Sequence, residues 1–221
     1  MTSLSDIAFV GPLHNQIMQA LTQLGEFPNL SNIETYNTAR QLIENYYLEN
    51  NLGNSQIIPF DEYQENVDII LNIDDVETYL ISLEAEGKIN AEQLQFLIQI
   101  NSFYQNATDP NVLANHLFDI QQSVSNSATL DLGQKALVYG AAVIGSNSGY
   151  YWFSAYNDPN DPWYPSESSD PGKKKPKWWE RGLRDLLGFI AGYYTLFWMT
   201  NDPTTGAKSG TAVAAGCSAA D

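Results

Sequence analysis

The stretch of sequence that decides the fold is ALVYGAAVIGSNSGYYWF, residues 136–153. It lies inside a predicted helix that runs from about Leu130 to Ala155, and apolar residues lie on nearly every side of that helix. A helix without a polar face is usually the central helix of a bundle. Its glycines and alanines would let neighbouring helices approach closely. The stretch therefore predicts an all-α protein with this helix at its centre.

Upstream of this stretch, apolar residues recur at helical spacing and the strict alternation of strands is rare. Capping residues, prolines and glycines separate the predicted helices. The sequence therefore predicts an irregular bundle of about six or seven helices over residues 4–155. The predicted helix starts are Ser31 with Glu34, Pro59, Asp74 or Asp75, Asn90 with Gln93, and Asp109 with Pro110, and the predicted stops are Gly25, Gly53 and Gly87.

The charge is divided unevenly along the chain. The 221 residues carry a net charge of −16. Residues 1–172 hold three basic residues against 22 acidic ones, whereas residues 173–221 hold seven against four. This change falls in a proline- and aspartate-rich segment without periodicity, which is typical of a linker. We therefore predict an acidic helical bundle at 1–156, a Pro/Asp-rich then Lys-rich linker at 157–177, and an apolar helix with a Gly/Ala-rich tail at 178–221.

The C-terminal segment begins with KKKPKWWERGLRD, residues 173–185, followed by the apolar run LLGFIAGYYTLFWMT, residues 186–200. Basic residues and tryptophans beside an apolar run are typical of a membrane interface. A helix of fifteen residues spans only about 22 Å, whereas the hydrocarbon core is roughly 30 Å thick. The run is therefore too short for a convincing membrane-spanning helix, and three alternatives remain: an interfacial helix, a re-entrant helix, or a buried helix of the bundle. The residues expected to contact a membrane or a partner are Lys173, Lys174, Lys175, Lys177, Trp178, Trp179, Arg181, Arg184, Phe189, Tyr193, Phe197 and Trp198.

Small residues recur four positions apart in this C-terminal segment, a spacing that lets helices pack closely. We consider three interpretations of it: a docking helix followed by a loose tail, a helical hairpin that lies on or inserts into a bilayer, and a helical oligomerisation element. Glycine weakens helices by about 1 kcal/mol relative to alanine, which favours the loose tail. The small residues expected at a helix-packing face are Gly188, Gly192, Gly206, Gly210, Ala214 and Ser218.

Two sequence features carry a likeness to other proteins. The pair His14-Asn15 and the tail GAKSGTAVAAGCSAA, residues 206–220, resemble uncharacterised bacterial proteins with an acidic all-helical body and a Gly/Ala-rich C-terminal segment. The tail also resembles the glycine-zipper segments of small membrane-active bacterial peptides. Those segments have a longer and more regular ridge of small residues. In this chain, Lys208 interrupts the ridge. The resemblance implies no activity and no functional residues.

Catalytic motifs are missing from the sequence. It has no Gly-x-Ser-x-Gly, phosphate-binding glycine loop, HExxH or CxxC pattern. A metal site of His14, His116 and Asp119 is conceivable, but a locally hydrogen-bonded histidine is the favoured interpretation at both histidines. The single cysteine, Cys217, excludes an intramolecular disulfide. We therefore predict a protein that is not an enzyme and has no metal and no cofactor.

The sequence leaves two functions open. The first is a non-enzymatic bacterial interaction protein whose C-terminal helix docks on the bundle or on a protein partner. The alternative is a membrane-active protein whose basic, Trp-bordered hairpin binds or enters an anionic membrane surface. The acidic charge disfavours nucleic acid, and the C-terminal segment offers a route to homo-oligomers. The N-terminal residues do not resemble a standard signal peptide, so we expect a cytoplasmic protein, or export by another route, with membrane association under the alternative.

Overall fold

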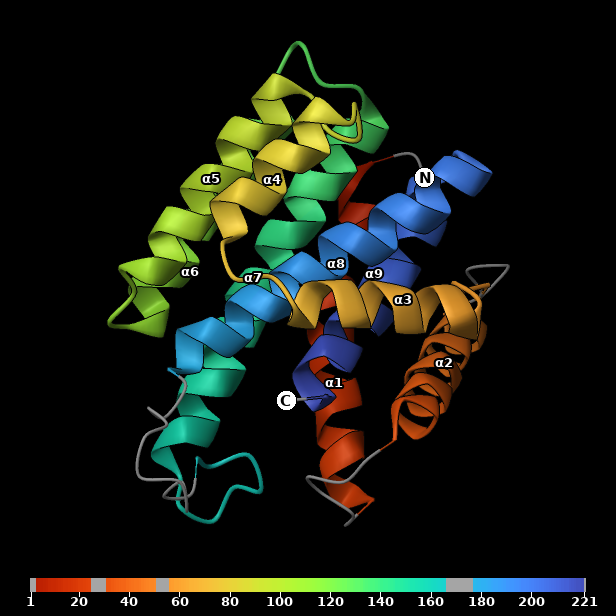
Figure 1. The fold of residues 1–221 in the computed structure, drawn as a ribbon, viewed down its shortest axis with the longest axis vertical. Coiled ribbons are helices and arrows are strands. Elements are labelled where there is room, and N and C mark those ends of the chain that lie inside the picture. Colours follow the sequence, from red (N-terminus) through yellow and green to blue (C-terminus); the bar gives the residue numbers. More distant parts are fainter. Residues whose placement is uncertain (1–2, 25–30, 51–55, 166–176, 221) are drawn as a thin grey trace.

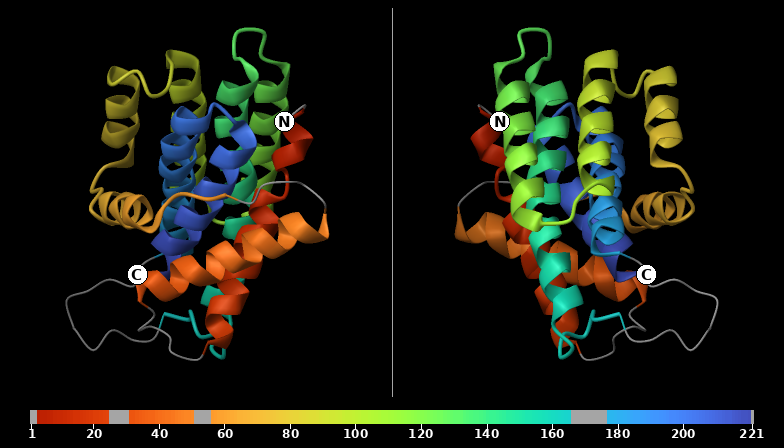
Figure 2. Two further views of the ribbon diagram at one scale, coloured as in Figure 1. Left: turned by 90° about the vertical axis from the view of Figure 1, so that its right-hand side faces the viewer. Right: turned by 90° about the vertical axis from the view of Figure 1, so that its left-hand side faces the viewer.

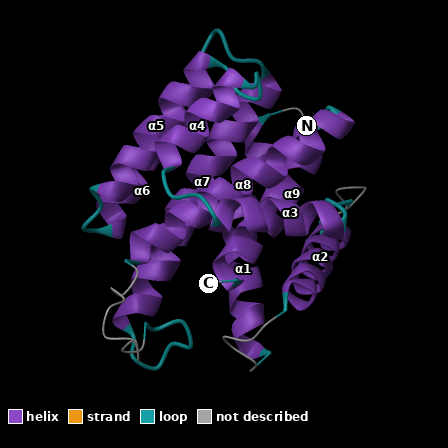
Figure 3. Cartoon of the chain, viewed as in Figure 1, coloured by secondary structure: helices purple, strands orange, loops and turns teal. Residues whose placement is uncertain are grey.

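The computed structural model describes residues 3–24, 31–50, 56–165 and 177–220 (Figure 1). The described residues form helices joined by turns and loops and contain no strand, which confirms the predicted all-α class (Figure 3). The helices are η1 (Leu4–Ile7), α1 (Val10–Gln23), α2 (Asn32–Glu49), α3 (Phe60–Leu71), α4 (Val76–Ala85), α5 (Ala91–Gln105), α6 (Pro110–Asn126), α7 (Leu132–Asn157), α8 (Trp178–Thr200) and α9 (Pro203–Ala219).

Capping boxes begin the helices where the sequence predicts them. At the start of α2, Ser31 Oγ accepts the Glu34 backbone N–H, and the Glu34 carboxylate accepts the Ser31 N–H at 2.9 Å. Asn90 and Gln93 make the same reciprocal pair at α5. Each box satisfies backbone donors that the first helical turn leaves unpaired. The predicted caps Asp75 and Asp109 begin α4 and α6, and Pro59 lies at the N-cap position of α3. The predicted stop Gly87 follows α4 at φ +73°. The other two predicted stops, Gly25 and Gly53, lie outside the described residues.

Helix α7 is buried along most of its length, as its apolar sequence predicts. It packs against α6, α8, α1 and α9. In the view of Figure 1, α4, α5 and α6 lie at the upper left of the molecule, α2 lies at the lower right, and α3 runs between α2 and α4. The second buried helix, α9, runs through the interior beside α8 (Figure 2).

The Gly/Ala-rich tail, for which the low helix propensity of glycine favours a loose conformation, forms helix α9 in the structure. Its residues from Gly206 to Ala219 are all buried. The low intrinsic helix propensity of this segment is overridden by tertiary packing, which supplies most helical stability in proteins. Because its side chains are so small, α9 fits into the narrow space between α8, α7, α1, α2 and α3. A bulkier helix would push these neighbours apart.

Glycines bring α8 and α9 into direct backbone contact. A Cβ atom added at Gly192 would lie 2.6 Å from the Ser209 carbonyl oxygen, and one added at Gly188 would lie 2.9 Å from the Ala214 Cα atom. From the other side, Gly210 leaves room for the backbone and ring of Phe189. The expected small-residue positions of the two segments therefore face one another and form a hairpin within a single chain.

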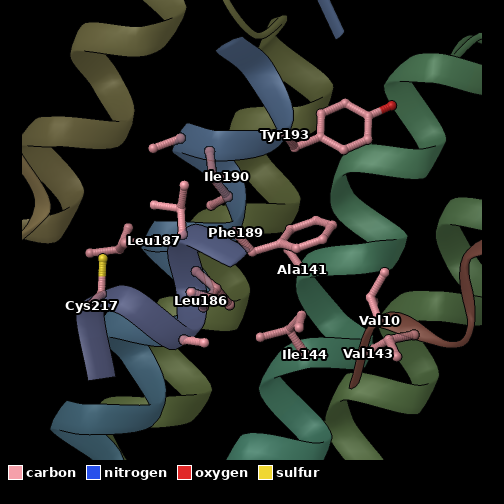
Figure 4. Packing of buried hydrophobic residues seen from close by; sticks show 14 of the residues in the cluster. Val10, Ala141, Val143, Ile144, Leu186, Leu187, Phe189, Ile190, Tyr193 and Cys217 are labelled. Carbon is pink, nitrogen blue, oxygen red and sulfur yellow. The ribbon is translucent and has the colours of Figure 1, made fainter. Parts of the chain in front are cut away.

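Phe189 shows how α8 also meets α7. Its ring and that of Tyr193 point from α8 towards α7, where Ala141 lies (Figure 4). A Cβ atom at Gly140 would lie only 2.4 Å from the Phe189 ring. One buried ring is thus enclosed by a glycine of α7 and a glycine of α9, and this close fit fixes the position of α8 in the bundle.

Candidate functional site

The two ends of α8 differ from its middle. Its middle is buried against the bundle, while aromatic side chains remain partly accessible at both ends. At the C-terminal end they border a groove of about 490 Å³, which we call the C-terminal groove. Residues of four helix ends line it: Gly87, Lys88, Ile89, Asn90, Gln93, Asp131, Gly133, Gln134, Leu137, Tyr193, Tyr194, Phe197, Trp198 and Asn201.

The floor of this groove is held by contacts between α8 and the start of α7. The Tyr193 hydroxyl donates to the Gly133 carbonyl oxygen at 2.9 Å. A Cβ atom at Gly133 would lie 2.5 Å from the Phe197 ring, so the glycine is what allows this ring to lie there. The Gln93 amide donates to the Gln134 carbonyl oxygen at 3.1 Å and ties α5 to α7. The groove is therefore formed by mutually fixed helix ends.

Two large apolar side chains are exposed in the last turn of α8: Trp198, which lines the groove, and the next residue, Met199. Trp198 is 64% exposed and Met199 is 63% exposed. Tyr194 is half-buried and packs edge-on against Trp198, with 5.7 Å between the ring centroids. Burial raises the pKa of Tyr194 to about 12, so its hydroxyl stays neutral at physiological pH. This end of α8 thus presents a neutral aromatic surface.

Charged side chains surround the aromatic surface. Lys88 Nζ lies 5.8 Å from the centroid of the Tyr194 ring and 2.9 Å from the Glu86 carboxylate. Asp131, the N-cap of α7, is exposed and also lines the groove. One cation and one carboxylate thus line the groove, and a second carboxylate, that of Glu86, is paired with the cation.

At the N-terminal end of α8, a second aromatic groove holds the predicted basic residue Lys177. Lys177 is exposed, with Nζ 5.3 Å from the centroid of the Trp179 ring. Trp178 packs edge-on against Phe153, with ring centroids 5.6 Å apart, and both tryptophans are half-buried. The groove measures about 490 Å³. The other predicted basic contacts in this region, Lys173, Lys174 and Lys175, lie outside the described residues.

The two predicted arginines of α8 make contacts inside the molecule. Arg181 donates to the Tyr156 hydroxyl at 3.1 Å and to the Ser218 carbonyl oxygen at 3.0 Å. Its guanidinium also lies 5.0 Å from the centroid of a Trp152 ring. Arg184 is half-buried in a groove shared with Asp74, Asp75 and Glu77. Through its bonds to Tyr156 of α7 and Ser218 of α9, Arg181 holds the end of α9 against α7 and α8.

The remaining predicted contact residues lie deeper. Phe189 and Tyr193 are buried and Phe197 is half-buried, so of this group only Trp198 is widely exposed. No helix in the described part of the chain is long and apolar enough to cross a membrane. The apolar face of residues 186–199 packs against the bundle, and insertion of the hairpin into a bilayer would require its release.

Sequence reasoning missed a buried polar cluster around Asp185. The Asp185 carboxylate accepts the Trp152 indole N–H at 2.7 Å and the Ser148 hydroxyl, and it lies 3.5 Å from His14 Nε2. All four side chains are fully buried. A signal was present, because Asp185 precedes Phe189 and Tyr193 by four and eight residues, which places it on their buried helix face.

This cluster does not have the arrangement of a catalytic triad. The Ser148 hydroxyl donates to Asp185, whereas a serine nucleophile would need His14 as the acceptor of its proton. Full burial also denies a substrate access in this structure. The cluster instead joins α1, α7 and α8 through one carboxylate.

The two histidines lie in separate environments. His14 is buried, with Nδ1 3.1 Å from the Asn15 amide oxygen. His116 is exposed on α6 and stacks on Phe103, with 4.4 Å between ring centroids. Within the described ranges, no three His, Cys, Asp or Glu residues are grouped so that they could hold a metal ion.

We expect His14 to make stability depend on pH. Burial lowers its pKa, but the charge of Asp185 and the hydrogen bonds to Asp185 and Asn15 outweigh burial and raise the pKa above 6.5. A raised pKa stabilises the fold below pH 6.5, and this stabilisation is lost as the pH rises through the folded-state pKa. The difference in unfolding free energy between the wild type and His14→Gln, measured in urea, should therefore shrink with rising pH. A difference that grows with pH would contradict this assignment.

Comparison of the chain with protein-family models, curated protein sequences and solved structures finds no match. The function must therefore be argued from the geometry of the chain itself.

Proposed function

We propose that this chain is a non-enzymatic interaction protein and that its C-terminal groove binds a segment of a partner protein. The observation that carries the proposal is the exposure of Trp198, which lines that groove, and of the next residue, Met199, on a helix whose middle is buried. Tryptophan and methionine are enriched at protein interfaces, and tryptophan is among the residues that contribute most binding energy. The volume of the groove is within the range of ligand-binding pockets.

The fixed floor of the groove also supports binding. Affinity is reduced by the entropy lost when a flexible site becomes ordered. Here the Tyr193 hydrogen bond to α7 and the Gln93 hydrogen bond between α5 and α7 hold the groove before any partner arrives. Little of the binding free energy would therefore be spent on ordering the site.

Self-association fits the structure less well. The small residues expected to support oligomers lie inside the chain, where α8 and α9 pack on each other. Two copies would also each carry a net charge of −16, and like charges repel. A different protein is therefore the proposed partner.

A photo-crosslinking experiment tests this function. A photoreactive phenylalanine analogue replaces Trp198 in the full chain, which is expressed in cells that naturally produce it. We expect one discrete adduct with another protein, because the side chain at 198 would be enclosed in the complex. The readout is a shifted band identified by mass spectrometry, which must weaken when unlabelled wild-type chain is added.

The matched control carries the same analogue at Phe118, which is 55% exposed on α6 and away from the groove. We expect no discrete adduct from that position. Equal adducts from both positions, or adducts of position 198 with lipid alone, would refute the proposed partner site. The second of these outcomes would support the membrane alternative.

A further inference from the structure

Resting on this proposed function, we infer that the partner segment is cationic as well as apolar, and that one of its lysine or arginine side chains lies against Tyr194 and Trp198. Aromatic ring faces attract ammonium and guanidinium groups within about 6 Å of the ring centroid. The structure already shows such a contact, because Lys88 Nζ lies 5.8 Å from the Tyr194 centroid. Lys88 therefore marks the position that a partner cation would take.

Lys88 is placed so that it can give way. Its side chain is 41% exposed and ends a flexible four-carbon chain, so its ammonium group can turn into solvent. Its charge is matched by Glu86, which lies 2.9 Å away and is 56% exposed. When Lys88 turns outward, the Tyr194 face and the Glu86 carboxylate both become accessible to a cation from the partner.

The charge around the groove favours the same class of partner. Glu86 and Asp131 contribute two negative charges against the single positive charge of Lys88. The whole chain adds a net charge of −16, which attracts cations over longer distances and speeds their association. An acidic segment would be repelled both at the edge of the groove and by the body of the protein.

A neutral polar ligand fits the groove less well, because several of its amide groups are already engaged. The side-chain amide oxygens of Asn90 and Gln93 each accept the other residue's backbone N–H, and the Gln93 side-chain amide nitrogen donates to the Gln134 carbonyl oxygen. Gln134 shares a capping box with Asp131. These amides hold the helix starts, which leaves the aromatic faces and the carboxylates as the main binding groups.

The test uses the full chain and two synthetic amphipathic peptides of the same length, one of leucine and lysine and one of leucine and glutamate. Binding is measured by fluorescence anisotropy at low and high salt. We expect only the lysine peptide to bind, and more weakly in high salt. Trp198→Ala should weaken binding by about tenfold or more. Glu86→Gln should weaken it by about threefold and Lys88→Gln should strengthen it by a similar factor.

The matched control is Glu65→Gln, which removes an exposed carboxylate of α3 outside the groove. General attraction of a basic peptide to an acidic protein would make Glu65→Gln and Glu86→Gln equivalent, and that result would overturn the inference. Weaker binding by Lys88→Gln, or preference for the glutamate peptide, would overturn it too. These outcomes leave the adduct at position 198 unaffected, so failure of the cationic inference is distinguishable from failure of the proposed function.

Discussion

Replacing Asp185 with alanine is expected to lower the free energy of unfolding by about 3–5 kcal/mol. The substitution removes the acceptor of the Trp152 indole N–H and of the Ser148 hydroxyl and leaves both donors buried. It also removes the charge that raises the pKa of His14. A buried donor without a partner costs roughly 1–3 kcal/mol, and this substitution creates two. The measurement is urea denaturation followed by far-UV circular dichroism.

Two further variants make the Asp185 experiment specific. Asp185→Asn keeps the size of the side chain and one oxygen acceptor, so it should cost less than alanine while abolishing the charge contact with His14. Asp119→Ala, at an exposed position of α6, should change stability by no more than about 0.5 kcal/mol. A loss from Asp185→Ala as small as that from Asp119→Ala would show that the cluster does not stabilise the fold.

Local signals predicted the helices well because their chemistry is local. Ser31 with Glu34 and Asn90 with Gln93 satisfy backbone donors within one turn, whatever the rest of the chain does. The helix α9 was judged by the same local standard, under which its glycines favour a loose tail. Its helical state depends on enclosure by five other helices, and that enclosure is not encoded near residues 203–219.

The residues of the candidate site also fall into two groups, those that a local pattern predicts and those that only the folded chain brings together. Trp198 was predicted as a contact residue because an aromatic at the border of an apolar run is visible in sequence. Lys88 and Asp131 were not predicted, because they come from the α4–α5 turn and the start of α7 and meet α8 only in the folded chain. Asp185 was noted only as the last residue of the basic stretch 173–185, although its helical spacing from Phe189 places it on the buried face. Tertiary placement thus brings together residues that lie far apart in the sequence, which local patterns alone do not predict.

Replacing Gly192 with alanine should destabilise the protein, although the same change stabilises an isolated helix by about 1 kcal/mol. The added Cβ atom would lie 2.6 Å from the Ser209 carbonyl oxygen and 2.7 Å from Val213 Cγ2. The first of these atoms is backbone, so relief requires α8 and α9 to move apart. We expect a net loss of about 1–3 kcal/mol for Gly192→Ala and a larger loss for Gly192→Val, since overpacking costs rise with added volume.

The sign of this effect separates close helix packing from helix propensity, so the control is another helical glycine. Gly149 of α7 would place its Cβ atom 3.0 Å from Leu113 Cδ2, the end of a flexible side chain that can turn away. Gly149→Ala should therefore be near neutral or stabilising. If Gly192→Ala raised the unfolding free energy by as much as Gly149→Ala, the hairpin could not be packed as closely as the structure shows. A loss of stability for Gly192→Ala but not for Gly149→Ala would mean that the missing side chain of Gly192 is what allows α8 and α9 to pack in backbone contact.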